Sequence, residues 1–180
     1  LVGDARFNGK KIAFHAGERD SEDVDAALAY EPDLIIHATH ATKKQLRHCA
    51  EMAIPIAVCP RSNWTLGVTT TANKPPLRLM LELGCTLYLG TDNVMFVPPD
   101  IFSEMAFIST VYGLEPEILL RAAIQGSELT GESFFIHNGA RANLFTIDPS
   151  QSALQFSRDP ITSITKRGSC GHIVHNIFNS

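Results

Sequence analysis

The sequence predicts an α/β protein built around a parallel sheet, and two observations support this prediction. Short apolar runs alternate with amphipathic segments over most of the chain, which is the order of parallel strands joined by right-handed helical crossovers. The 180 residues are 44% hydrophobic and 19% charged. This composition supplies a buried core for one ordinary domain and argues against disorder.

Four strands are expected in the first half of the chain. They are short apolar runs bounded by polar or turn residues, and they lie at about 11–15, 33–37, 55–59 and 86–91. The third run is expected to end at Pro60, which opens a long loop.

Helices are expected between and after these strands, at about 21–30, 42–53, 75–83, 100–112 and 115–125. Ser21 and Thr42 precede the first two helices and have side chains that cap helix N-termini. Gly84 follows the third helix, where glycine commonly ends a helix.

The pattern changes after about residue 135. Asn138-Gly139 is a turn signal, and strands are expected at 143–147, 161–165 and 172–178. We therefore predict a barrel-type domain over 1–135 and a small β subdomain over 136–180.

Composition also narrows the function classes. A net charge of −4 without a basic run argues against a nucleic-acid partner. No apolar run reaches the roughly 20 residues that span a bilayer, so no membrane partner is expected. The four cysteines are dispersed, which disfavours a disulfide framework and suits a reducing, cytoplasmic location.

Polar side chains follow three of the predicted strands. His15 follows the first strand, His37 the second and Asp92 the fourth. The C-terminal ends of parallel strands form one rim, where chemistry is done in such folds. Two imidazoles and a carboxylate favour a divalent metal, zinc or iron. Glu18, three residues after His15, is a candidate proton shuttle to that site.

Each residue also has a simpler interpretation. His37 is a candidate buried core histidine, Asp92 a candidate Asx turn, and the segment 59–63 a candidate tight turn. The coincidence of three such residues at strand ends favours the site. The remaining histidines are not expected to join the site. His40 is expected to be a loop or supporting residue, and His48 and His137 are expected to face solvent. His172 and His175 are expected to lie on opposite faces of a strand.

Four motifs in order resemble the second half of the metal-dependent amidohydrolase superfamily. They are H-x-x-E from His15, H-x-x-H from His37, P-x-S-N from Pro60 and L-G-T-D from Leu89. The nearest branch is the cytosine-deaminase-like and S-adenosylhomocysteine-deaminase-like group. The segment 139–147 is also similar to that family's G-x-x-A-D-L strand, with Asn143 where an aspartate is usual.

The resemblance implies a fold and a set of roles. The chain would be the C-terminal half of a (β/α)₈ TIM-like barrel, strands five to eight, plus part of a small β-sandwich subdomain. His15 and Asp92 would bind the metal, and Asp92 would also accept a proton from water. Glu18 would carry protons to the leaving nitrogen, and His37 would orient the water or polarise the substrate.

The implied activity is hydrolysis of non-peptide C–N bonds. The substrate would be a small molecule, an aminated heterocycle or nucleoside-like compound that is deaminated by metal-activated water. Ser62 and Asn63 would shape the substrate pocket from the seventh-strand loop.

One departure from the family is large. The family's first strand ends in H-x-H, which supplies two metal ligands, and no H-x-H occurs in these 180 residues. A whole barrel needs about 200 residues or more. We therefore expect an incomplete chain, inactive alone, whose partner is the missing N-terminal half of the barrel or another copy of the chain. The alternative is a non-catalytic truncated fragment that acts only in assembly.

Overall fold

The computed structural model describes residues 1–150 and 152–178 of the chain. They form two compact units, Leu1–Pro98 and Pro99–Ser180. This boundary differs from the predicted division into 1–135 and 136–180, which remains a prediction about domains.

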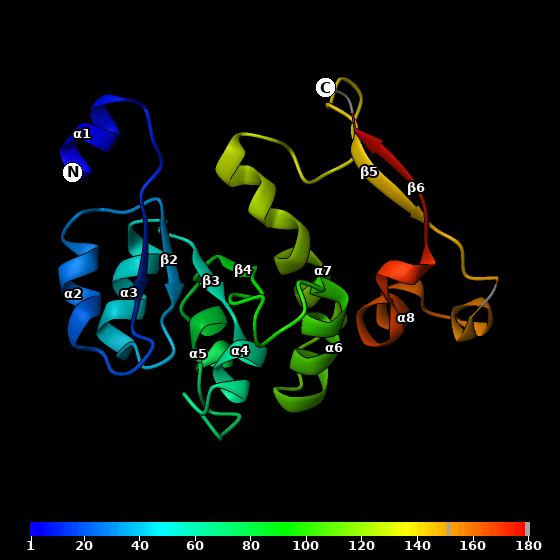
Figure 1. Ribbon diagram of the computed structural model, residues 1–180, viewed down its shortest axis with the longest axis horizontal. Coiled ribbons are helices and arrows are strands. Elements are labelled where there is room, and N and C mark those ends of the chain that lie inside the picture. The colour runs from blue at the N-terminus through cyan, green and yellow to red at the C-terminus, as the bar shows by residue number, and fades with distance from the viewer. Residues whose placement is uncertain (151, 179–180) are drawn as a thin grey trace. The chain divides into compact units, whose positions relative to one another are not determined.

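A four-stranded parallel sheet organises the first unit. Its strands follow the chain order β1-β2-β3-β4 (Figure 1), and their bounds are Ala13–Ala16, Leu34–His37, Ile56–Val58 and Leu87–Leu89. Each strand is parallel to its neighbour. Sequential parallel pairing is the arrangement of consecutive strands in a (β/α)₈ barrel, so the predicted α/β class and partial barrel are confirmed.

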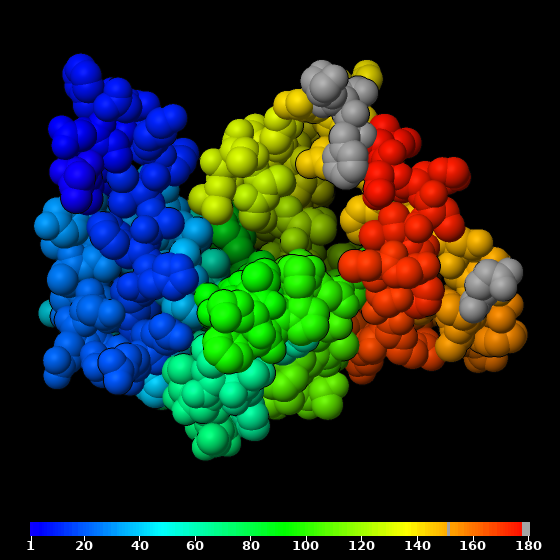
Figure 2. All heavy atoms as spheres, in the orientation of Figure 1, coloured from blue at the N-terminus to red at the C-terminus, as the bar shows by residue number. Residues whose placement is uncertain are grey.

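Helices connect these strands. They are α2 (Glu22–Leu28), α3 (Lys43–Glu51), α4 (Pro60–Thr65) and α5 (Leu77–Glu82). A further short helix, α1 (Val2–Phe7), precedes the sheet and forms the dark-blue end of this unit in Figure 2. The sequence analysis missed both α1 and α4.

Buried apolar side chains join the sheet to its helices. Ile35 on β2, Ile56 on β3, Leu46 on α3 and Met80 on α5 are all completely buried, with exposed fractions of 0%. The strands carry this core because both faces of a parallel sheet are covered in such folds.

The local capping signals have different outcomes. Thr42 caps α3 as predicted, because its hydroxyl accepts a hydrogen bond from Gln45 N and its backbone N–H donates one to Gln45 Oε1. Ser21 stands at the N-cap position of α2 but makes no capping hydrogen bond.

The expected loop is wrong over Pro60–Thr65, although residues 66–76 that follow are irregular, and the alternative of a tight turn over 59–63 is wrong as well. Residues Pro60–Thr65 form α4 instead. Pro60 occupies the first turn of this helix, where its fixed φ is favourable and its missing N–H costs nothing.

The second unit combines helices with a small antiparallel sheet. Its helices are α6 (Ile101–Val111), α7 (Pro116–Ile124) and α8 (Pro160–Arg167), with 3₁₀ helices at Gln125–Thr130, Ala153–Phe156 and Cys170–His172. Strands β5 (Asn143–Ile147) and β6 (Ile173–Phe178) pair antiparallel, close to two of the three predicted strands.

The strand predicted at 161–165 is wrong, because these residues belong to α8. Asp159 caps that helix by accepting a hydrogen bond from Thr162 N, and Pro160 occupies its first turn. The hydroxyl of Thr165 donates to Ile161 O one turn earlier. These local hydrogen bonds outweigh the strand preference of the β-branched residues.

His172 also departs from the prediction, because it lies in the last 3₁₀ helix and not on β6.

Within the part of the chain that the structure describes, no helix is both long and apolar enough to cross a membrane.

Candidate metal centre and proton-transfer site

Three predicted site residues meet at one end of the sheet in the first unit. His15, His37 and Asp92 each offer a ligand atom, and these atoms all lie within 4.8 Å of one another. His15 Nδ1 is 3.0 Å from His37 Nε2. The predicted convergence at the strand C-termini is therefore what the structure shows.

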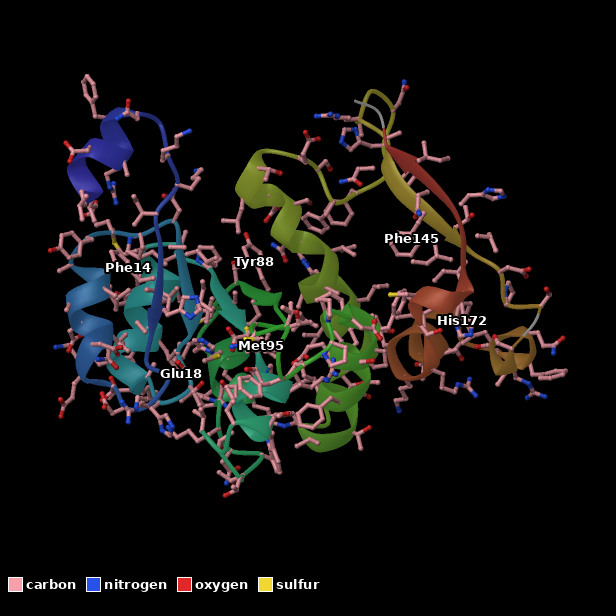
Figure 3. The ribbon with its side chains drawn as sticks, in the orientation of Figure 1. Phe14, Glu18, Tyr88, Met95, Phe145 and His172 are labelled. Carbon is pink, nitrogen blue, oxygen red and sulfur yellow. The ribbon has the colours of Figure 1, made fainter. Side chains whose placement is uncertain are left out.

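The register of the sheet explains this convergence. Ala16, the residue after His15, pairs with His37, so the two histidines lie one step apart on adjacent parallel strands. Asp92 follows the end of β4 by three residues. Figure 3 shows Glu18 just beyond the end of β1 and Met95 in the connection that follows β4.

Unusual backbone geometry accompanies two of these residues. His37 has φ +78° and Asp92 has φ +59°, both in the left-handed region. Non-glycine residues are uncommon there, although aspartate, asparagine and histidine tolerate it better than most. Such conformations persist where the surrounding structure holds them, and they cluster at functional sites.

Side chains of the helix α4 form hydrogen bonds to residues in and beside the site. Ser62 and Asn63 are both completely buried, with exposed fractions of 0%. Ser62 Oγ donates a hydrogen bond to Asp92 Oδ2 at 2.6 Å, and Asn63 Nδ2 donates to Thr39 Oγ1 at 2.7 Å. Both residues were expected in a loop around the substrate, but they lie on a helix and form hydrogen bonds to residues that follow β4 and β2.

Glu18 completes the group. Its Oε2 atom lies 3.9 Å from His37 Nε2, and its side chain is 33% exposed. It is thus near the histidine and still reachable from solvent.

His37 experiences opposing electrostatic effects. Burial lowers its pKa most strongly, the Glu18 and Asp92 carboxylates raise it, His15 lowers it, and the Asn63 side chain raises it; the net pKa is lowered. The imidazole is therefore mainly neutral near pH 7. Among the described residues, His37 Nδ1 and Asn63 Oδ1 are buried without a hydrogen-bond partner of good geometry.

The other histidines lie outside the cluster. His48 and His137 are exposed, and His40 lies in the loop after β2. His172 and His175 belong to the second unit. Among the described residues, only His15, His37 and Asp92 form a cluster that could hold a metal ion.

Two supporting residues were missed by the sequence analysis. Thr39 is completely buried, and its only signal was its place between the two histidines of H-x-x-H. Gln45 bonds to Ser21 O in the loop after β1, and its signal was the capping-box position three residues after Thr42.

Comparison with known proteins decides the family. The family model described as adenosine deaminase matches residues 2–145. The chain belongs to the adenosine deaminase family. This confirms the predicted membership of the amidohydrolase superfamily, and the family model that matches is the adenosine deaminase model.

Individual relatives agree with this family assignment. One relative is a protein of Archaeoglobus fulgidus that is named as an aminohydrolase. It is 34% identical over 163 residues, which cover 91% of this chain and 45% of the relative's length. The chain thus spans about half the length of the curated relatives it matches.

Two solved structures resemble the fold. An adenosine deaminase from Xanthomonas campestris, crystallised with bound zinc, has a TM-score of 0.82 at 20% identity, covering 98% of this chain and 46% of that one. A guanine deaminase from C. acetobutylicum, crystallised with guanine in its active site, has a TM-score of 0.75 at 16% identity, covering 98% and 49%.

Proposed function

We propose that this chain supplies half of the active site of a hydrolytic deaminase. Its substrate is a small aminated heterocycle or nucleoside-like molecule, from which ammonia is released by cleavage of a non-peptide C–N bond. The observation that carries the proposal is the cluster of His15, His37 and Asp92 within 4.8 Å, with Glu18 3.9 Å from His37.

The donor set fits a divalent metal, zinc or iron. Two imidazoles and a carboxylate are ligands that both metals accept, and the two histidine nitrogens already approach to 3.0 Å. We assign the metal to His15 and Asp92. A divalent cation held there supplies Lewis-acid activation of a water molecule.

The protein's own groups then move the protons. Asp92 accepts a proton from the attacking water on its free oxygen, because Ser62 Oγ occupies Oδ2. Glu18 passes protons to the ring nitrogen and to the departing nitrogen, which leaves as ammonia, and these two protons are replaced by the two that the water loses, the first of them through Asp92. His37 Nε2 lies beside both carboxylates and orients the water or stabilises the oxygen that develops negative charge at the ring carbon.

The pocket is proposed to admit purine-like compounds. One structural neighbour named above is an adenosine deaminase and the other was crystallised with guanine in its active site, and the family model is that of adenosine deaminases. In this proposal Ser62 and Asn63 form hydrogen bonds to Asp92 and Thr39, and they shape the pocket indirectly by fixing these two residues.

A partner is proposed to complete the barrel. Within the described residues β1 pairs only with β2, and β4 pairs only with β3. The unpaired hydrogen-bonding groups of such edges favour the addition of further strands. We propose that the remaining strands and metal ligands come from an N-terminal half of the barrel or from another copy of the chain.

The dispersed free cysteines are consistent with a cytoplasmic site of action.

The test is ammonia release by the zinc-loaded protein with adenosine, adenine and guanine, each assayed with and without an added N-terminal half of a family member. Turnover that is lost in Asp92→Asn supports the proposal. A correctly folded protein that binds no zinc and releases no ammonia in either condition favours the alternative of a non-catalytic assembly fragment.

A further inference from the structure

We propose that Gln45 is a positioning residue for Glu18, because its side chain ties the loop that carries Glu18 to the start of α3. The inference rests on the proton-transfer role proposed above for Glu18. The loop comprises residues 17–21 and joins β1 to α2. Gln45 lies on the next helix of the chain, outside the four motifs.

Gln45 uses both ends of its amide. Its Oε1 accepts hydrogen bonds from Thr42 N at 2.8 Å and from Thr42 Oγ1 at 3.0 Å. Its Nε2 donates to Ser21 O at 3.0 Å. The side chain is nearly buried, with 4% exposed. Only an amide supplies an acceptor and a donor in this arrangement, since an ionised carboxylate accepts alone.

The beginning of the same loop is also fixed. Gly17 N donates to Asp23 Oδ1 at 2.8 Å, and Gly17 O accepts from His40 N at 2.8 Å. Gly17 has φ +70°, and a Cβ atom there would lie 2.9 Å from Val24 Cγ2 and 3.1 Å from Ala38 Cα. These two hydrogen bonds hold the start of the loop, and position 17 does not accommodate a side chain in this conformation.

Glu18 therefore lies between two anchors, Gly17 at the start of the loop and Ser21 at its end. The Ser21 anchor depends on a single side-chain donor, Gln45 Nε2. Proton transfer requires a carboxylate within hydrogen-bond reach of its partner, and small displacements of catalytic groups lower turnover steeply. Releasing Ser21 should therefore lower kcat more than it changes KM.

Three variants separate this role from helix capping. Gln45→Glu keeps an oxygen facing Thr42 but loses the donor to Ser21, whereas Gln45→Ala loses both. Thr42→Val is the control, because it removes the hydroxyl cap of α3 and leaves Gln45 Nε2 in place. The measurements are hydrogen exchange of the Glu22 amide, whose N–H belongs to the same peptide group as Ser21 O and donates to Asp20 Oδ1 at 2.9 Å, and steady-state kinetics of the zinc-loaded protein with the added N-terminal half of a family member.

We expect exchange of the Glu22 amide to rise about tenfold in both Gln45 variants, the scale of one lost hydrogen bond. We expect kcat to fall about tenfold with KM within about twofold. Thr42→Val should lower the melting temperature and leave loop exchange and kcat near wild type.

Wild-type exchange in Gln45→Glu would overturn the inference, as would equal effects of Gln45→Glu and Thr42→Val. Faster exchange with unchanged kcat would overturn the positioning role. If the wild-type protein releases no ammonia even with the added N-terminal half, the proposed function fails and the positioning role fails with it, while exchange of the Glu22 amide still shows whether Gln45 holds the loop.

Discussion

Replacing Ser62 with alanine tests how the protein orients Asp92. Ser62 Oγ is completely buried and donates to Asp92 Oδ2 at 2.6 Å. A hydrogen bond to a charged group contributes about 1.5–3 kcal/mol. Since about 1.4 kcal/mol corresponds to tenfold in an equilibrium constant, the orienting bond is large enough to affect metal binding measurably.

We expect Ser62→Ala to weaken zinc binding about 10–100-fold, the range found when a partner of a metal-ligating residue is removed. The physical reason is that Asp92 loses the donor that fixes the orientation of its carboxylate towards the metal and the water. The assay is zinc titration against a competing chelator of known affinity, with urea unfolding of the same samples.

The chain offers a matched control at Ser103. Its hydroxyl donates to Asp100 Oδ2 at 2.5 Å, so Ser103→Ala also deletes a serine–aspartate hydrogen bond, but in the second unit. That variant should lose stability without losing zinc affinity. Zinc affinity of Ser62→Ala within twofold of wild type would refute the reasoning and leave Ser62 a purely structural role.

Three further changes have definite expected outcomes. Glu18→Gln should keep zinc bound and lower kcat about 10²-fold or more, the usual scale for a lost acid–base group; near-normal turnover would remove Glu18 from the mechanism. Asp92→Asn should abolish ammonia release and weaken zinc binding, because an amide accepts no proton from water; full metal content by elemental analysis would contradict its assignment as a ligand. Asp100→Ala should lower the unfolding free energy by about 1 kcal/mol at pH 7 through loss of the α6 cap. Partial burial tends to raise the pKa of Asp100, but the hydrogen bonds from Ser103 and Phe102 outweigh it and the pKa is lowered. The stabilisation is therefore complete above the unfolded value near 3.8 and is lost as the pH falls through the lowered pKa. Urea unfolding at pH 7 and pH 3 checks this, and a difference that stays constant or grows towards pH 3 would contradict it.

The strands and the positions of the site residues were predictable from the sequence. Short apolar runs locate β1 to β4, and the polar residue after a run marks the end of its strand. His15, His37 and Asp92 could be placed together without coordinates, because parallel topology brings strand C-termini to one rim.

The helix α8 was not predictable in the same way. Its β-branched residues favour a strand, and the helix cap, in which Thr162 N donates to Asp159 Oδ1, reverses that preference. The propensity of β-branched residues is weak compared with a capped first turn, so the pattern alone gave the wrong element.

What the sequence by itself determined is the alternation of elements and the identity of the residues at the strand ends, since both depend on local order along the chain. Only the tertiary structure decided which side chains form hydrogen bonds to the residues near the strand ends. Ser62 reaches Asp92 across 30 residues, Asn63 reaches Thr39 across 24, and Gln45 reaches Ser21 across 24. These pairings exist because helices from different crossovers pack at the same end of the sheet, and sequence spacing does not encode distances between elements that meet only in the folded chain.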